Sequence, residues 1–262
     1  EYLVQSRQVM EESLRMFHHT MERFRDGFFF YYFSSLDQNS HILWGRHEEE
    51  LLPYYEAIDL AVGEAAARAV GDATLIVMSD HGFAAFERAV HLNTWLWKEG
   101  FMTLGAWSGE DSGEMFSRVD WPRTRVYALG LNSVYLNLKG REPQGCVTAG
   151  AESDALIREL EDRLLKFRDP DSGRLIVQSV YRPAEVYRGR NLRYAPDLIV
   201  GYARGYRSSW QSSLGGIPDI TVEDNTQDWI ADHCMAAEAV PGVFLSNRKC
   251  RLEDAMLWDY AR

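Results

Sequence analysis

Three pairs of aspartate and histidine stand out as side chains that could bind a metal ion. The pairs are Asp37 and His41, Asp80 and His81, and Asp232 and His233. Carboxylate and neutral imidazole ligands without thiolates suit Zn²⁺ or Mn²⁺ better than Ca²⁺, which takes oxygen ligands only. Three separated pairs are harder to attribute to chance than one. The residue types therefore predict a site for divalent metal ions.

The positions of the pairs differ in what they indicate. Asp80 and His81 come after the apolar run of residues 74–78, which is typical of a buried parallel strand. The carboxyl end of such a strand is where open α/β sheets bind ligands. Asp37 and His41 are four residues apart, which places both on one face if the chain is helical there. Helix capping, a surface histidine and satisfaction of backbone groups at a strand end remain the alternatives.

Other polar residues carry weaker signals. Tyr206 and Arg207 lie in a predicted long loop and could contact a substrate, the arginine through a bidentate contact with an anion. Packing and solvation are the alternatives for these two residues. Cys234 is better explained as a small buried thiol, and His91 is a weak candidate ligand. Solvated or capping roles best account for the remaining histidines, which are His18, His19 and His47.

The composition excludes some classes of partner. The chain has 262 residues, of which 28 are basic and 39 acidic, for a net charge of −11. This charge repels phosphate backbones and predicts no general nucleic-acid binding. A small phosphorylated substrate stays compatible with it, because a bound divalent cation would dominate the local field. No stretch approaches the roughly 18 apolar residues of a membrane span, and the residues leave the oligomeric state open.

Helices and strands are predicted to alternate around the metal-binding pairs. An amphipathic helix is predicted up to Asp26 and Gly27, followed by an aromatic strand over residues 28–33. A second long helix is predicted over residues 47–70, and it leads into the apolar run 74–78. Two strands joined by a helix form a crossover, which predicts an α/β fold with a mostly parallel sheet flanked by helices.

The middle of the chain is predicted to form a small inserted α+β cap. The elements expected within it are an exposed loop over 106–123, strands within 125–138 and 175–180, and a helix over 152–167. A short helix over 91–100 is expected before it, and a strand over 197–202 and a long loop over 205–228 are expected after it. The predicted organisation is a core part with metal motifs over residues 1–105, a cap over 106–195, and a return to the core with the last metal histidine over 196–262.

Taken together, the motifs resemble a known group of enzymes. The segments that carry the resemblance are YYFSSLDQNSH, LIVMSDHGF, HLNTWLWKEGF, GREPQG and DHCMAAEAVPGVFLSNRK. They are similar to the alkaline phosphatase superfamily, specifically to its type I phosphodiesterase/nucleotide pyrophosphatase-like branch of phosphohydrolases and phosphomutases. The resemblance covers most of the chain and implies the fold of that superfamily.

The resemblance also implies a cofactor and a set of site residues. In that superfamily a Thr or Ser attacks a phosphate ester between two divalent metal ions, usually Zn²⁺, with Mn²⁺ as the alternative. Carried over by position, Asp37, His41 and His233 resemble the ligands of one metal, and Asp80 and His81 resemble two ligands of the other. Two cations about 4 Å apart can activate a hydroxyl, clamp the phosphoryl group and stabilise the leaving oxygen.

One part of the superfamily's motif has no counterpart before Asp37. The nucleophile and a further Asp ligand belong to the end of the first strand, whereas residues 1–26 are predicted to be helical. We therefore expect the carboxyl-terminal part of a longer protein, with the Thr or Ser nucleophile upstream of Glu1 and little turnover by this chain alone. The implied function of the full-length protein is a two-metal phosphoric ester hydrolase; a phosphomutase and a non-catalytic metal-binding fragment are the alternatives. Its location in the cell stays open, with a lean to the cytoplasm.

Overall fold

The computed structural model describes residues 1–106 and 115–249, and these form two compact units. Unit 1 consists of Glu1–Ala85, Asp228–His233 and the described part of Val240–Arg262, and unit 2 consists of Phe86–Gln227 and Cys234–Ala239. The chain therefore leaves unit 1 after Ala85 and returns to it at Asp228. It leaves again for the short segment Cys234–Ala239 and returns at Val240. The boundaries at 105 and 195 that the sequence indicates stay a prediction.

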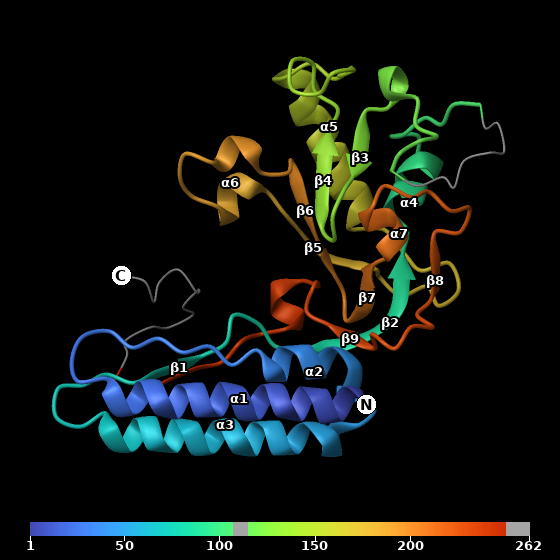
Figure 1. The fold of residues 1–262 in the computed structure, drawn as a ribbon. Coiled ribbons are helices and arrows are strands. Elements are labelled where there is room, and N and C mark those ends of the chain that lie inside the picture. The colour runs from blue at the N-terminus through green and yellow to red at the C-terminus, as the bar shows by residue number, and fades with distance from the viewer. Residues whose placement is uncertain (107–114, 250–262) are drawn as a thin grey trace. The chain divides into compact units, whose positions relative to one another are not determined.

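Each unit contains both helices and strands (Figure 1). The elements of unit 1 are α1 (Tyr2–Arg23), α2 (Ser35–Leu43), α3 (Glu48–Arg68), β1 (Ile76–Met78), the start of β2 (Ala84–Val90), β9 (Ala231–Asp232) and β10 (Phe244–Ser246). The elements of unit 2 are the rest of β2, α4 (Leu92–Lys98), β3 (Val126–Ala128), β4 (Ser133–Leu136), α5 (Ala151–Leu164), β5 (Val177–Tyr181), α6 (Pro183–Val186), β6 (Leu198–Tyr202), β7 (Gly205–Ser208), α7 (Trp210–Ser213) and β8 (Val222–Asp224), with 3₁₀ turns at Trp121–Arg123, Leu192–Tyr194 and Ala237–Ala239.

The long helices of unit 1 form where the sequence predicts them. α1 and α3 lie side by side, and the buried residues Phe17, Met21 and Ala61 form one apolar cluster between them (Figure 1). The three- and four-residue spacing of apolar side chains places them on one stripe of each helix. Three glutamates, residues 48–50, occupy the first turn of α3, where negative charge is favourable next to the helix dipole.

The aromatic run 28–33 is extended, but it pairs with no other strand among the described residues, so the predicted strand is wrong. Its side chains still alternate. Phe29, Tyr31 and Phe33 pack around Phe17 of α1 with ring centroids 5.3 to 6.1 Å apart, while Phe28, Phe30 and Tyr32 are exposed. Alternation requires only an extended backbone, whereas a strand also requires a hydrogen-bonded neighbour.

The apolar run 74–78 forms a strand, but its surroundings differ from the prediction. β1 pairs antiparallel with β10, and Met78 lies opposite Phe244. Ile76 and Met78 are exposed rather than buried. The sequence pattern identified the strand correctly but could not identify its partner, because an apolar run specifies burial only when another layer covers it.

Unit 2 contains two sheets built on one core. One sheet places β2 between β7, which runs parallel to it, and β8, which runs antiparallel. The other has the order β3-β4-β6-β5 and is antiparallel throughout. Leu156, Leu160 and Leu164 of α5 are buried in the same cluster as the strand residues, and each fully buried leucine contributes about 1.5–3 kcal/mol.

The expectation of a mostly parallel sheet is therefore wrong for the described residues, where β2 and β7 form the one parallel pair of named strands. The predicted mixed α/β class is correct. The predicted loop 205–228 contains β7, α7 and β8, because short strands leave little periodicity to detect. Part of the predicted loop 106–123 lies outside the described residues.

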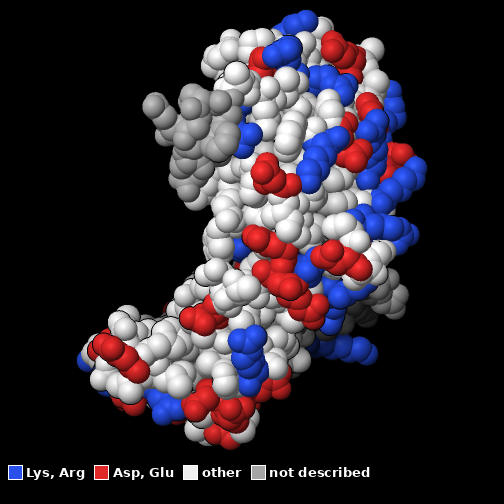
Figure 2. Space-filling view, turned by 90° about the vertical axis from the view of Figure 1, so that its right-hand side faces the viewer, with Lys and Arg blue, Asp and Glu red and all other residues white. Residues whose placement is uncertain are grey.

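The described helices and one face of the surface bear on membrane crossing and on charge. Among residues 1–106 and 115–249, no helix is long and apolar enough to cross a membrane. On the face in Figure 2, basic and acidic side chains of the described residues are interleaved, so this face presents no continuous basic stripe. Such a stripe is what general binding to nucleic acid requires.

Candidate metal centre

Two candidate ligands lie one turn apart on α2. Asp37 occupies the first turn of this helix and His41 the last, so the four-residue spacing aligns their side chains on one face. α2 packs against α3 and against β9. His41 is 4% exposed, and its backbone carbonyl accepts a hydrogen bond from the N–H of Ile230 at 2.8 Å. The helix thus holds one carboxylate and one imidazole next to β9.

Asp80 and His81 lie in the loop that follows β1. This loop is anchored through Ser79, whose N–H donates to the carbonyl oxygen of Val243 at 2.9 Å. In return, the N–H of Val243 donates to the hydroxyl oxygen of Ser79 at 2.9 Å. The reciprocal pair of bonds fixes the start of the loop and therefore the position from which His81 projects.

Two glycines allow this loop to approach the chain before β10. A methyl group on Gly82 would lie 2.6 Å from the carbonyl oxygen of Pro241, and one on Gly242 would lie 2.5 Å from that of Ser79. Contacts this short do not occur in folded proteins, so any side chain would force the backbones apart. The tetrapeptide Ser79 to Gly82 therefore depends on both glycines for its position.

His233 follows β9, in which Asp232 lies opposite Ala84 of β2. The carboxylate of Asp232 is 1% exposed and accepts two hydrogen bonds. Its Oδ1 accepts from the backbone N–H of His233, and its Oδ2 accepts from the indole N–H of Trp229, both at 2.8 Å. A short strand pairing and a buried carboxylate thus hold His233 in place.

These segments bring four side chains together around one oxygen atom. Oδ1 of Asp37 lies 3.6 Å from Nε2 of His233 and 3.8 Å from Nε2 of both His41 and His81. The ligand atoms of Asp37, His81 and His233 all lie within 4.8 Å of one another. Unit 1 alone therefore brings four possible metal-ligand atoms, one oxygen and three nitrogens, into a single small space.

The hydrogen bonds of two histidines determine where their lone pairs lie. Nδ1 of His41 is 2.9 Å from the carbonyl oxygen of Ala231, and Nδ1 of His81 is 3.1 Å from that of Gly82. A carbonyl oxygen can only accept, so each Nδ1 carries the proton and each neutral ring has its lone pair on Nε2. Metal-binding histidines are oriented in this way by their second nitrogen.

Oδ1 of Asp37 is buried and accepts no hydrogen bond. A buried carboxylate oxygen without a donor is costly, and lone pairs that face it increase the cost. A cation bound among these atoms would remove this cost, because Oδ1 and the Nε2 atoms of His41 and His81 are all acceptors. The residues present therefore fit a divalent metal ion of the type that takes nitrogen and oxygen ligands.

The surroundings of His233 favour the form of this side chain that binds metal. Burial lowers the pKa of His233, and the nearby His81 and His41 lower it further against the opposing effect of Asp232. The neutral imidazole of His233 is the metal-binding form. On the rim, burial together with the negative charges of Asp37 and Asp80 raises the pKa of Tyr32.

Asp80 lies apart from the other candidate ligands. Its side chain is 71% exposed, and its Oδ1 is 3.7 Å from Nε2 of His81. The imidazole rings of His81 and His233 stack with centroids 3.6 Å apart and planes 13° from parallel. The structure thus brings Asp37, His41, His81 and His233 together and leaves Asp80 on the outer side of His81.

A family comparison places the chain among known proteins. Residues 4–232 match the family described as type I phosphodiesterase / nucleotide pyrophosphatase, which is most of the chain. The chain belongs to this family. The predicted resemblance to the alkaline phosphatase superfamily, which includes the family, is thereby confirmed. No curated protein matches the chain.

Membership in the type I phosphodiesterase / nucleotide pyrophosphatase family indicates the general chemistry. The family hydrolyses phosphoric esters, acts on small phosphoester substrates and is typically metal-dependent. The matched region includes four of the candidate ligands and ends one residue before His233. The Asp and His side chains of the candidate metal centre are thus residue types that can bind metal ions, in keeping with a typically metal-dependent family.

The weaker substrate candidates are buried within unit 2. Tyr206 is 1% exposed and its hydroxyl donates to Asp169 at 2.9 Å. Arg207 is 1% exposed, and its guanidinium lies 4.0 Å from the ring centroid of Trp210 and 5.2 Å from that of Phe86. Their contact with a substrate stays a prediction, and in this structure both side chains pack in the interior.

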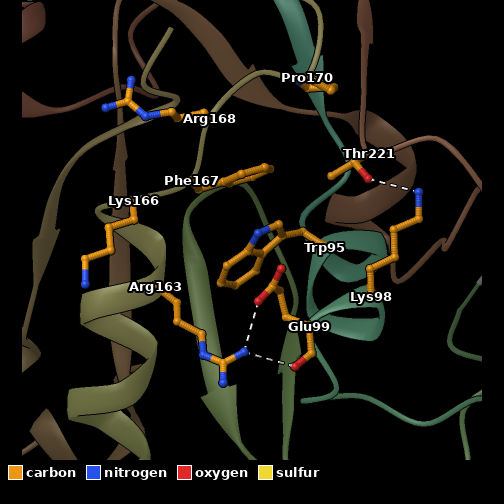
Figure 3. Close-up of a pocket in the computed structure, with 9 residues that line it drawn as sticks. All are labelled: Trp95, Lys98, Glu99, Arg163, Lys166, Phe167, Arg168, Pro170 and Thr221. Atoms are coloured by element: carbon orange, nitrogen blue, oxygen red, sulfur yellow. Dashed lines mark hydrogen bonds and ion pairs between the residues drawn. The ribbon is translucent and has the colours of Figure 1, made fainter. Parts of the chain in front are cut away.

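Unit 2 has a recess of about 390 Å³ beside the stacked rings of Trp95 and Phe167 (Figure 3). Its lining includes Lys98, Arg163 and Lys166. Arg163 pairs with Glu99 and Glu159, and Lys166 pairs with Asp162. Two of the cations are thus already neutralised, and the recess contains no histidine or unpaired carboxylate with which to hold a metal ion.

Sequence reasoning did not identify the residues that surround the ligands. The indole of Trp229 stacks on the ring of His41 with centroids 3.8 Å apart. Its N–H also binds Asp232, three residues along the chain. The adjacency of Asp232 and His233 was the available signal, but no local pattern relates Trp229 to His41, 188 positions earlier.

Proposed function

We propose that this chain binds divalent metal ions at the Asp37 centre and that the full protein is a two-metal phosphoric ester hydrolase. The observation that carries the proposal is the buried Oδ1 of Asp37, which accepts no hydrogen bond and faces three imidazole Nε2 atoms. Family membership supplies the reaction class, and this arrangement supports the metal dependence.

The proposed ligand sets follow the order of the motifs. Asp37, His41 and His233 would hold one ion, and Asp80 and His81 would hold the other. The stacking of His81 and His233 supports this division, because lone pairs lie in the ring planes and nearly parallel planes 3.6 Å apart do not meet at one ion. Two ions held separately by the two rings would have the close spacing of about 3.5–4 Å that is common in two-metal sites. Zn²⁺ is the favoured ion, with Mn²⁺ as the alternative.

The residues of this chain would have defined tasks in the reaction. The bound ions would act as Lewis acids on the phosphoryl oxygens and on the attacking hydroxyl. His41 and His81 keep their protons on Nδ1, where the carbonyl oxygens of Ala231 and Gly82 accept them. The exposed Asp80 lies where a second ligand set can be completed.

The proposal assigns neither the nucleophile nor the last Asp ligand to this chain. Residues 1–36 contain α1, the extended aromatic run and the start of α2, and no strand-end Asp followed by Thr or Ser occurs among them. We propose that those two groups come from a preceding segment of the longer protein and that this chain alone turns over little substrate. A non-catalytic metal-binding fragment is thus the second candidate.

The first test is metal binding by the full chain. Zinc is titrated in competition with a chromogenic chelator, and metal content is measured after dialysis. We expect tight binding by the wild-type chain and unchanged binding by His47→Gln, which removes an exposed imidazole that pairs with Glu49. A wild-type chain that binds neither Zn²⁺ nor Mn²⁺ would overturn the proposal.

The second test is turnover of a chromogenic phosphodiester by a longer protein that supplies an upstream Asp and a Thr or Ser. Hydrolysis that needs Zn²⁺ or Mn²⁺ supports the hydrolase. Transfer of the phosphoryl group back to a sugar phosphate, seen by product analysis, would point to the phosphomutase instead. Metal binding without either activity would favour the non-catalytic candidate.

A further inference from the structure

Trp229 and Asp232 surround two of the proposed ligands without belonging to the ligand set. The indole of Trp229 covers one face of the His41 imidazole, with centroids 3.8 Å apart and planes 24° from parallel. Phe83 approaches the same imidazole edge-on, with centroids 4.8 Å apart. The ring of His41 is therefore held from two directions, and rotation about its side-chain bonds would meet both aromatic rings.

Asp232 connects this stack to the second ligand. Its Oδ2 accepts the indole N–H of Trp229, and its Oδ1 accepts the backbone N–H of His233, both at 2.8 Å. The carboxylate is 1% exposed, so these bonds form in surroundings where water competes little. One buried side chain thus fixes the aromatic ring that covers His41 and the backbone from which His233 projects.

A further hydrogen bond holds Nδ1 of His41. The carbonyl oxygen of Ala231 lies 2.9 Å from Nδ1 of His41, whereas Oδ2 of Asp232 lies 4.0 Å from it. Ala231 precedes Asp232 in β9, so the same short segment holds both this hydrogen bond and the carboxylate that accepts from Trp229. The imidazole is thereby fixed with Nε2 3.8 Å from Oδ1 of Asp37.

We propose that Trp229 and Asp232 are positioning residues for the metal centre: the pair fixes the plane of the His41 ring and the backbone of His233. This inference rests on the proposed function, because it concerns ligands of the proposed metal ions. Outer groups that orient metal ligands commonly contribute about 10- to 100-fold to metal affinity. We expect contributions of this size here.

The test uses the full chain and two metal readouts. Zn²⁺ affinity is measured against a chromogenic chelator, and Co²⁺ is titrated to record its visible absorption, which reports the ligand geometry. Trp229→Phe keeps an aromatic ring over His41 but removes the N–H, and we expect about a tenfold loss of Zn²⁺ affinity. Trp229→Leu removes both features, and we expect about a 100-fold loss with an altered Co²⁺ spectrum.

Two further variants separate positioning from stability. Asp232→Asn tests the buried carboxylate, and we expect it to weaken Zn²⁺ binding at least as much as Trp229→Phe does. Trp121→Phe is the matched control, because it makes the same change in unit 2 at an indole that packs on Tyr127 with centroids 5.2 Å apart. We expect this control to keep wild-type affinity and the wild-type Co²⁺ spectrum. Circular dichroism identifies any variant that fails to fold, and Trp229→Phe is the mildest of the set.

The outcomes distinguish this inference from the proposed function. A wild-type chain that binds neither metal removes the proposed function and this inference with it. If the wild type binds and folded Trp229→Phe and Trp229→Leu bind as tightly with unchanged spectra, the positioning role is wrong and the metal centre stands. A lower melting temperature with unchanged metal affinity would likewise show that Trp229 and Asp232 only stabilise the fold.

Discussion

The candidate site depends most on one side chain, the carboxylate of Asp37. Its buried Oδ1 accepts no hydrogen bond and lies within 3.8 Å of three imidazole nitrogens. Most buried polar atoms in proteins have a partner, so an exception requires an explanation. The proposed metal ion would provide one, because the cation would neutralise the carboxylate and coordinate the nitrogens that now face it.

Substituting Asp37 should therefore weaken metal binding more than substituting a surrounding residue. We expect Asp37→Asn to lower Zn²⁺ affinity by more than about 100-fold, the upper end for groups outside the ligand set. The chain should stay folded, because the amide is nearly isosteric and no hydrogen bond to Oδ1 is lost. Chelator competition gives the affinity and thermal melting checks the fold; wild-type affinity in this variant would show that Asp37 is not a ligand.

A buried histidine of unit 2 predicts a dependence of stability on pH. His91 is fully buried, with Nδ1 2.8 Å from the hydroxyl oxygen of Ser209 and Nε2 2.9 Å from Oε1 of Glu223. Burial lowers the pKa of His91, and Glu223 opposes this effect only in part. Although the side chains resemble a nucleophile with its base, the hydroxyl of Ser209 is also the acceptor that caps α7 and is buried.

The sign of the pH effect follows from proton uptake. As the pH falls through about 6.5, the unfolded chain protonates His91 while the folded chain does not. The free energy of unfolding should therefore decrease as the pH is lowered from 7 toward the folded pKa and level off below it. Urea unfolding at several pH values measures the slope. We expect a shallower slope in His91→Gln, and an unchanged slope would contradict this assignment.

At the scale of secondary-structure elements, the loop between β1 and β2 depends on its close approach to the backbone just before β10. Among the described strands β1 pairs with β10 alone, and a two-stranded sheet contributes little stability by itself. The reciprocal bonds between Ser79 and Val243 supplement that pairing. The proposed metal ligands Asp80 and His81 are thus placed by backbone contacts rather than by a deep core.

Adding a methyl group at this contact should disturb both stability and the metal centre. In Gly242→Ala the new methyl would lie 2.5 Å from the carbonyl oxygen of Ser79, so the two backbones must separate. We expect a loss of about 1–3 kcal/mol in the free energy of unfolding together with weaker Zn²⁺ binding. Gly63→Ala is the control, because a methyl there meets no atom within 4 Å and alanine favours a helix by about 1 kcal/mol over glycine. Equal stability of the two variants would contradict the close approach.

At the scale of the whole molecule, the four clustered ligands lie in one unit although they come from distant parts of the sequence. Asp37, His41 and His81 belong to the first segment of unit 1, and His233 belongs to a short segment that returns after unit 2. The recess beside Trp95 and Phe167 lies in unit 2 and contains no such ligands. Metal binding should accordingly act on one unit of the chain.

We expect zinc to protect unit 1 selectively from hydrogen exchange. A ligand that binds only the folded state stabilises it by an amount that grows with its concentration, about 2.7 kcal/mol at 100 times the dissociation constant. Exchange should slow in α2 and around residues 79–83 and 229–233, and it should change little in α5. Hydrogen exchange with mass spectrometry, with and without Zn²⁺, measures this. Equal protection of α5 and α2 would contradict a centre confined to unit 1.

The local features of the protein could be predicted from its sequence. Apolar periodicity is a property of neighbouring residues, so α1, α3 and α5 form where it indicates. The four-residue spacing of Asp37 and His41 and the place of His81 after an apolar run are local as well. These motifs also identified the family, which residues 4–232 confirm.

Only the tertiary structure decided which distant segments meet. The pairing of β1 with β10 and the stacking of Trp229 on His41 depend on contacts between residues far apart in the chain. So does the outcome for the run 28–33, which pairs with no strand among the described residues. Local pattern determines whether a segment is helical or extended, because the backbone responds to its neighbours. Pairing and packing are set by competition among all segments for the same partners, and that competition determined which side chains surround the carboxylate of Asp37.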